Sequence, residues 1–201
     1  MKLLDTLFGR VKPARSRAEQ LFAISTAVVT LETRLDLKPT GRGGLAIRPL
    51  TASDFQETQT QMMQLLQTSA KETGSQVAVS KDEFGYLWVV VHDDQFEDVV
   101  STLYAANISM ADAGYLNQIL AALFQFSSND GKEIDWIYNF KRASFYPFIP
   151  LQTGQRRDNA EELRLASVMQ GELPIEKDPA QWYALWGAPL EAAKANKAEE
   201  V

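Results

Sequence analysis

The sequence predicts one α+β domain built around a mainly antiparallel sheet, with short helices near its N-terminal and C-terminal ends. Apolar residues alternate with period two in several stretches, and helical spacing follows each group of them. A chain of 201 residues corresponds to one ordinary domain. Its 45% hydrophobic and 23% charged residues are typical of a globular protein. We therefore divide it into an amphipathic segment (1–15), a single α+β domain (16–190) and a disordered tail (191–201).

The first ten residues have the pattern of a short amphipathic helix, and Pro13 separates this helix from the next one. A second short helix is expected to begin at Ser16, because Ser16 and Glu19 stand at capping-box spacing before an apolar stretch. Four apolar residues share one side of the first helix: Leu3, Leu4, Leu7 and Phe8.

Three rounds of two strands and one helix (ββα) are expected after residue 26. In the first round, residues 27–35 (AVVTLETRL) are β-branched and partly alternating, and residues 44–50 (GLAIRPL) resemble a hairpin partner. The glycine-rich stretch 40–44 is then the turn between them. Residues 52–72 have helical spacing, and Gly74 ends that helix.

The second round consists of strands at 76–81 (QVAVSK) and 85–93 (GYLWVVVHD), followed by a helix. Both faces of the strand at 85–93 are apolar, so we expect a central strand that is covered on both sides. Asp94 and Glu97 have the spacing of a capping pair at the start of the helix.

In the third round, residues 117–127 fit either a strand or a helix by composition. The turn at 129–131 (NDG) is a hairpin signal and favours a strand, with residues 132–142 as its partner. Asp158 caps the next helix, and Asp178 followed by proline begins a last short helix.

Composition excludes several classes of chemistry. The chain has no cysteine, which rules out disulfides, cysteine-ligated zinc, iron–sulfur clusters and thiol nucleophiles. The net charge of −6 argues against nucleic-acid binding. No apolar run reaches the length of a bilayer span, and no signal peptide is recognisable. We therefore expect a cytoplasmic protein without cofactor or metal.

The single histidine, His92, is the main candidate for catalysis. It lies among acidic residues, so Asp93 or Asp94 could orient it as a general base in an enzyme of unknown class. In the alternative, His92 ends a strand before a helix whose N-terminus favours acidic residues. No second histidine or nucleophile motif supports catalysis, so we expect a protein that is not an enzyme.

The stretch Gly41-Arg42-Gly43-Gly44 has the composition of a phosphate-binding loop. A phosphate loop requires a helix directly after the glycines, whereas a strand is expected here. The prediction is a hairpin turn.

Residues 141–157 combine aromatic and basic side chains, interrupted by two prolines. Two interpretations stay open. The segment is a partner-binding surface with aromatic and arginine anchors, or the aromatic residues fill the core at a strand end while the arginines neutralise acids. The residues concerned are Lys141, Arg142, Phe145, Tyr146, Phe148, Arg156 and Arg157.

The N-terminal segment is the other candidate for a contact surface. Residues 1–17 contain five basic residues and one acidic residue. Peripheral contact with an anionic membrane fits this pattern. Docking onto a partner, or onto the domain itself, fits it as well.

Several stretches resemble the PspA-associated protein PspAB family. They are LLDTLFGR, LKPTGRGG, FGYLWVVVHDDQFEDVV, YNFKRASFYPFIPL, RRDNAEELRL and WYALWGAPL, and they extend from the start of the chain to about Leu190.

The resemblance implies an accessory role in the envelope-stress response of the phage shock protein A system, without an assigned reaction or cofactor. It also implies one of two partners, which is either a phage shock protein A-like membrane-remodelling protein or an HtpX-like membrane protease. The expected location is the cytoplasm, at the inner face of the membrane. We therefore predict a non-enzymatic adaptor, with the enzyme based on His92 as the alternative.

Overall fold

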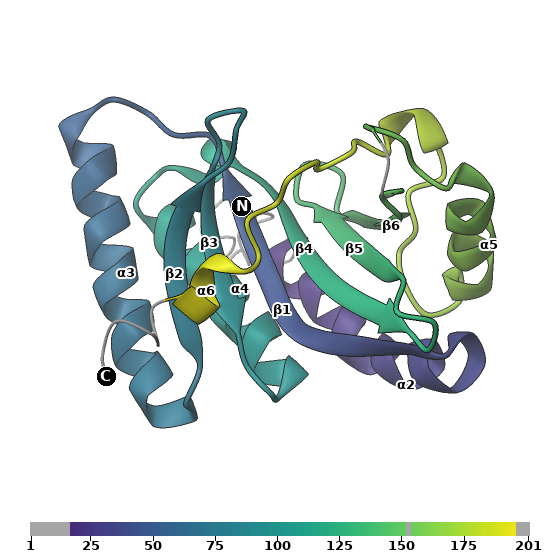
Figure 1. The fold of residues 1–201 in the computed structure, drawn as a ribbon. Helices are drawn as coiled ribbons and strands as arrows, with labels where there is room; N and C mark the ends of the chain where they lie inside the picture. The colour runs from purple at the N-terminus through teal and green to yellow at the C-terminus, as the bar shows by residue number, and fades with distance from the viewer. Residues whose placement is uncertain (1–16, 152–153, 196–201) are drawn as a thin grey trace, which may run out of the picture.

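The computed structural model describes residues 17–151 and 154–195. A six-stranded sheet forms its centre, and helices cover one face of this sheet (Figure 1). Every pair of neighbouring strands is antiparallel. The predicted α+β class with a mainly antiparallel sheet is thus confirmed.

The strands do not follow one another across the sheet in chain order. Their spatial order is β2-β3-β1-β4-β5-β6, so the first strand lies in the middle, between β3 and β4. β2 and β6 are the edge strands of the sheet. The strands are β1 (Leu37–Ile47), β2 (Gln76–Lys81), β3 (Leu87–His92), β4 (Ile119–Ser128), β5 (Glu133–Asn139) and β6 (Ser144–Phe148).

The helices cluster around this sheet. Figure 1 shows α2 and α4 behind the sheet, α3 beside β2 and α5 beside β6. The helical elements are η1 (Gln20–Phe22), α2 (Ala23–Leu35), α3 (Ser53–Thr73), α4 (Phe96–Asp112), η2 (Leu116–Gln118), α5 (Asn159–Met169), η3 (Pro179–Gln181) and α6 (Ala192–Ala195). In the part of the chain that is described, none of them is both long and apolar enough to cross a membrane.

The first ββα round is wrong, because residues 27–35 belong to helix α2. Four buried residues of α2 recur at helical spacing: Ile24, Ala27, Leu31 and Leu35. Burying this stripe against the sheet outweighs the low helix propensity of the β-branched residues between them. Asp36, with φ of 54°, ends the helix. The predicted glycine-rich turn is also wrong, because residues 40–44 lie inside β1.

Four other strands, β2 to β5, agree with the sequence predictions, whereas β6 (Ser144–Phe148) was not predicted as a strand. Residues 119–128 form a strand, as the turn at 129–131 indicated. The helix after Asp158 is capped by that residue, whose carboxylate accepts from the Glu161 backbone N–H at 3.2 Å. The expected helix after Asp178 is a single 3-10 turn. The observed order is therefore a single strand, then two strands, then three, rather than three pairs.

Two apolar clusters lie on opposite faces of the sheet. The larger one packs the inner sides of α2, α3, α4 and α5 against residues such as Val89, Phe124 and Trp136. The smaller one lies on the other face and includes Trp88, Tyr146 and Leu190. Residues 182–193, which we call the C-terminal segment, cross this second face and end in α6 (Figure 1).

The predicted tail needs a correction where it is described. Ala192–Ala195 form the helix α6, and Ala193 is fully buried against the second cluster. The contact is favourable because α6 packs on β2 and β3, where Ala193 joins Ala78, Trp88 and Val90 in one buried cluster. The rest of the tail and the predicted N-terminal helix, with Leu3, Leu4, Leu7 and Phe8, lie outside the described residues. The division at 1–15, 16–190 and 191–201 otherwise stays a prediction.

Candidate functional site

His92 ends β3 and is half-buried. Its Nδ1 lies 3.1 Å from the carbonyl oxygen of Gly41, on the neighbouring strand. The buried carboxylate of Asp93 accepts from the Ser75 hydroxyl and, at 2.7 Å, from the Gln95 backbone N–H. Asp93 therefore fixes the turn that leads into α4. The predicted Asp94–Glu97 capping pair is wrong, because Gln95 is the N-cap and no side chain caps it.

A row of polar side chains crosses the sheet at the level of His92. Cross-strand pairing aligns Gln76, His92, Arg42, Gln125 and Asp135 on five neighbouring strands. Directly opposed residues of neighbouring strands point to the same face. This face is the one that the C-terminal segment crosses. We call these five residues the polar row.

Arg42 connects the polar row to the C-terminal segment. Its Nη1 donates to the Gln125 side-chain oxygen at 3.2 Å and forms an ion pair with Glu191. The Nε of Arg42 and one carboxylate oxygen of Asp135 are buried without a hydrogen-bond partner among the described residues. Burial raises the pKa of Asp135 to about 8, so this side chain is mostly neutral at pH 7. The polar row therefore contains one cation, Arg42, and one protonated acid, Asp135. Both lie on the face of the sheet that the C-terminal segment crosses.

The glycines of β1 allow other parts of the chain to pack closely against it. A Cβ on Gly43 would lie 2.7 Å from the Val99 Cγ1 of α4. A Cβ on Gly44 would lie 2.9 Å from the Trp88 ring on the opposite face. The phosphate-loop interpretation has no support, because β1 continues as a strand after these residues. Their role is to let both layers approach the central strand.

The aromatic side chains of the 141–157 segment are buried. Phe145, Tyr146 and Phe148 belong to β6 and have at most 1% of their surface exposed. Of the two interpretations left open by the sequence, core filling is therefore the one that fits these three residues. They are not available as anchors for a partner in this structure.

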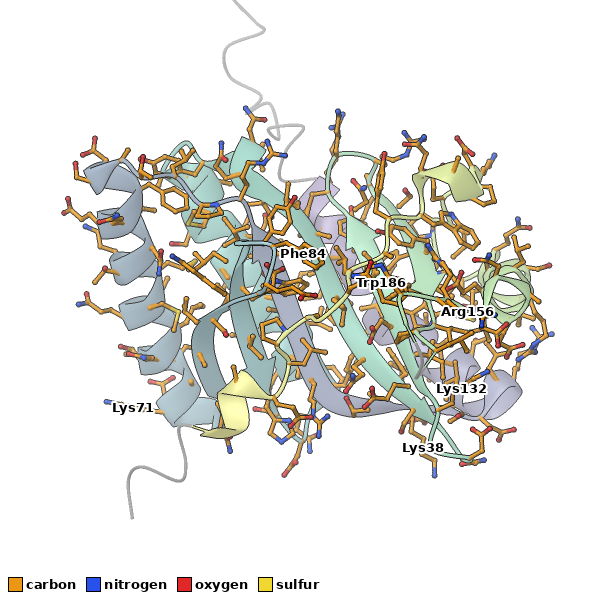
Figure 2. All side chains as sticks on the ribbon, turned by 45° about the horizontal axis from the view of Figure 1, so that its top comes forward. Lys38, Lys71, Phe84, Lys132, Arg156 and Trp186 are labelled. Carbon is orange, nitrogen blue, oxygen red and sulfur yellow. The ribbon has the colours of Figure 1, made fainter. Side chains whose placement is uncertain are left out.

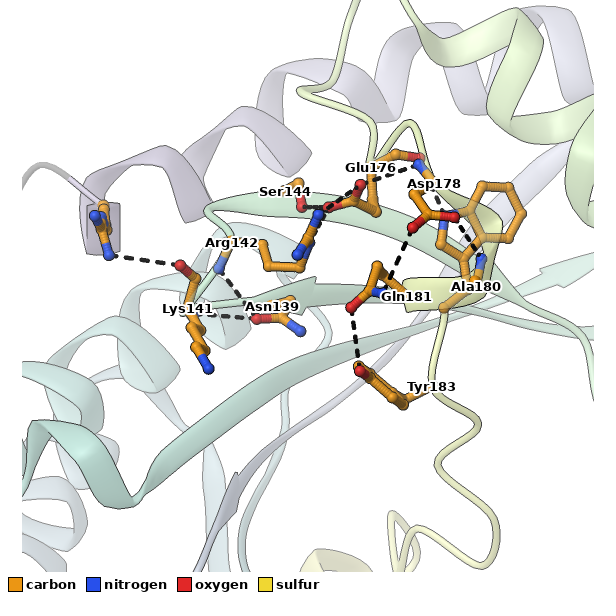
Figure 3. Close-up of polar contacts among 11 residues, drawn as sticks. Asn139, Lys141, Arg142, Ser144, Glu176, Asp178, Ala180, Gln181 and Tyr183 are labelled. Carbon is orange, nitrogen blue, oxygen red and sulfur yellow. Dashed lines mark hydrogen bonds and ion pairs between the residues drawn. The ribbon is translucent and has the colours of Figure 1, made fainter.

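Arg142 and Glu176 form an ion pair at the end of β6 (Figure 3). The Glu176 carboxylate also accepts from the Ser144 hydroxyl at 3.1 Å and from the Asp178 backbone N–H at 3.0 Å. The hydrogen bond from Arg142 is the main reason that the pKa of Glu176 falls to about 2. This pair holds residues 174–176 against the outer edge of β6, where Phe145 forms a parallel bridge with Ile175.

Arg157 forms a second cluster with the fully buried Glu162. Its Nε donates to the Glu162 carboxylate at 2.8 Å, and its Nη1 donates to the Trp182 carbonyl at 2.6 Å. The Ile149 backbone N–H donates to the same carboxylate at 2.8 Å. Burial raises the pKa of Glu162, and the Arg157 guanidinium opposes this rise. Arg157 therefore joins α5, the end of β6 and the C-terminal segment.

The remaining basic residues of the segment are on the surface. Lys141 and Arg156 are exposed, and the backbone carbonyl of Lys141 accepts from Arg17 Nη1 at 3.5 Å. Arg17 is the first described residue of the chain. The point at which residues 1–16 join the domain therefore lies beside Lys141, at the start of the aromatic and basic segment.

The structure brings together residues that the sequence left separate. Gln125 and Asp135 were missed, because strand pairing alone places them in one row with Arg42 and His92. A charged residue between Ile134 and Trp136 in an alternating strand was the one available signal for Asp135. Among the described residues, no three histidine, aspartate or glutamate side chains gather into a group that could hold a metal.

A comparison with protein-family models finds a match that covers residues 1–190. The matching family is PspAB, described as PspA associated protein B. No curated protein and no solved structure shows significant similarity to the chain. Because the family model covers nearly the whole chain and contains the residues described above, the chain belongs to the PspAB family.

Proposed function

We propose that the protein is a non-enzymatic adaptor that binds PspA in an envelope-stress response at the cytoplasmic side of the membrane. The family description, PspA associated protein B, supports PspA as the partner. Binding of an HtpX-like protease stays a prediction of the sequence resemblance. Our proposal replaces the enzyme based on His92, for which the described residues provide no carboxylate hydrogen-bonded to the imidazole.

The observation that carries the proposal is the contact between Arg17 and Lys141. It brings the attachment point of the basic, apolar N-terminal segment next to the exposed Lys141, on a chain whose net charge is −6. An isolated basic surface on an acidic protein favours association with an acidic partner and steers its approach. We call Arg17 and Lys141 the basic surface.

Binding of purified PspA to the full-length protein tests this proposal. We expect the double variant Arg17→Glu, Lys141→Glu to bind PspA at least about tenfold more weakly, which is about 1.4 kcal/mol. The matched control is Lys38→Glu, Lys71→Glu, which changes the net charge equally. Both control residues are exposed. Figure 2 shows Lys71 beside the end of α3, and Lys38 is level with the start of β5, whereas Lys141 follows the end of β5.

The two parts of the proposal can fail separately. If the wild-type protein does not retain PspA, the adaptor function is wrong. If the two double variants bind PspA equally well, the function stands but the basic surface is not the interface. Arg157, which the sequence suggested as a contact residue, is unsuitable for such a test, because its guanidinium is part of a buried cluster.

A further inference from the structure

A groove with a volume of about 340 Å³ lies between α3 and the outer edge of β2. Five α3 side chains and three residues of β2 line it: Gln59, Thr60, Met63, Gln64, Gln67 and Val77–Val79. None of these residues is charged. The groove thus combines a strand edge with a helix side that offers amides, a hydroxyl and one thioether.

The edge of β2 is open in the described part of the chain. β2 pairs with β3 on one side, in regular register from Gln76 to Lys81. No other described segment forms a backbone hydrogen bond with Val77–Val79. An edge strand directs alternate N–H and C=O groups outward, and proline, lysine or a bulge normally protects them. Val77–Val79 contain no proline, lysine or bulge.

The opposite edge of the sheet shows how the molecule closes such a strand. The Phe145 N–H of β6 donates to the Pro174 carbonyl at 2.8 Å, and the Glu176 N–H donates to the Phe145 carbonyl at 2.8 Å. An extended stretch of the chain itself thus adds to β6. The β2 edge has the same unpaired geometry and an adjoining groove, but no such stretch among the described residues.

We propose that the β2 edge binds an extended, uncharged peptide segment of a partner by strand addition. Main-chain hydrogen bonds to Val77–Val79 would hold the segment, and its side chains would alternate toward and away from α3. Met63 would contact an apolar side chain, and Gln59 and Gln67 would donate to polar groups beside it. A charged side chain under α3 would lose hydration without a counter-charge, so an uncharged segment is selected.

A second copy of the chain fits this edge poorly. Met62 and Leu66 of α3 are buried in the same cluster as Val77, so α3 packs directly on β2. If two β2 strands paired, each would bring its own α3 to the same face. Neighbouring strands are about 5 Å apart, whereas packed helices need about 8–10 Å between their axes. An added strand without its own helix has room.

Selection of a phage-displayed library of random decapeptides on the full-length protein provides the probe. We expect enrichment of uncharged peptides with an apolar residue flanked by polar ones. The affinity of the enriched peptides is then measured by fluorescence anisotropy. We expect Gln67→Trp, which fills the groove, to weaken binding at least about tenfold, which is about 1.4 kcal/mol. Gln61→Trp is the matched control, because Gln61 is exposed on α3 outside the groove.

Two further measurements test the main-chain contacts. Methylation of alternate backbone nitrogens of the bound peptide should abolish binding in one register and leave it intact in the other. Amide hydrogen exchange of Val77–Val79 should slow when peptide is added. Failure to enrich any peptide, equal binding by Gln67→Trp and Gln61→Trp, or unchanged exchange at these amides would each overturn the proposal. Concentration-dependent dimerisation that protects the same amides would assign the edge to a second copy instead.

The β2 edge is independent of the basic surface, which lies near the opposite edge of the sheet. Gln67→Trp is expected to leave PspA binding through Arg17 and Lys141 intact. The two proposals therefore fail on different variants.

Discussion

The protonation state of Asp135 depends on its burial between β4 and β6. Its carboxyl group is neutral in the folded chain up to about pH 8 but ionises at the ordinary pKa of 3.8 when the chain unfolds. Between these values the folded state binds one proton more than the unfolded state. Stability is therefore lost as the pH rises through this window, by up to about 1.4 kcal/mol per pH unit.

We expect Asp135→Asn to abolish this loss. The difference in unfolding free energy between the variant and the wild type should be small near pH 4 and should grow in favour of the variant toward pH 8. Urea unfolding at several pH values measures it. Asp94→Asn, at an exposed position, serves as the control and should show no such trend. A difference that does not change with pH would contradict the buried, protonated state.

Arg157 and Arg156 are neighbours in sequence with opposite environments. Arg157→Ala leaves the carboxylate of Glu162 buried without its cation, so we expect a loss of about 2–4 kcal/mol in unfolding free energy. Arg156→Ala removes an exposed side chain, and we expect a change below about 0.5 kcal/mol. Denaturant midpoints of the two variants give the comparison. Similar midpoints would show that the Arg157 cluster contributes little to stability.

At the scale of the elements, most strands were predictable from local patterns, but β1 was predicted only in its second half and β6 was not predicted. Alternating apolar residues predicted β2, β3 and β5, and the turn at 129–131 predicted β4. These predictions were possible because each strand pairs with one that is next to it in the sequence. β1 pairs instead with strands far along the chain, at 87–92 and 119–128. Its glycines therefore looked like a turn, and its actual partners were not recognisable from local spacing.

Some residues of the candidate site were also predictable from the sequence, but their surroundings were not. His92 and the 141–157 segment stood out by residue type, yet their environments depend on tertiary pairing. Tyr146 and Phe148 of β6 are core because the C-terminal segment covers them, with Tyr146 stacked near Trp182, whereas Phe145 is buried on the opposite face of the sheet. The groove at β2 had no signal in sequence, since it arises where α3 packs on an edge strand.

The packing of α4 on β1 provides a prediction at this scale. Gly43→Ala places a methyl group against Val99 and Leu103, so we expect a loss of about 1–3 kcal/mol in unfolding free energy. Gly171→Ala is the matched control, because a Cβ there meets no atom within 4 Å. We expect no loss at that position. Thermal unfolding of both variants measures the loss. Equal melting temperatures would mean that α4 moves to accommodate the methyl group without a loss of stability.

For the whole molecule, the C-terminal segment is the layer that covers the second face of the sheet. Trp182, Leu190 and Ala193 are buried there, and Glu191 pairs with Arg42. Trp186 packs edge-to-face on Phe148, and Figure 2 shows it among the side chains over this face. Of the longer helices, α5 also contributes to this cluster, through Ala166.

We expect Leu190→Asp to detach this layer. Leu190 packs over Gly44 and Trp88, so a carboxylate in its place would be desolvated without a partner. The expected results are a lower melting temperature and binding of the dye ANS to the exposed apolar face. Tyr183→Asp, at an exposed position, should show neither. Wild-type dye binding by Leu190→Asp would show that the segment stays in place without this contact.

The central position of β1 also bears on how the chain is made. β1 leaves the ribosome early, but both of its partners are synthesised later, and the second ends at Ser128. Until β3 has been made, β1 has no strand to pair with, and its second edge stays unpaired until β4 is complete. Non-local pairing of this kind is slow. The final face is covered only after Ala193 has emerged. During synthesis there is therefore a long interval in which α2 is complete but β1 has not yet paired with both β3 and β4.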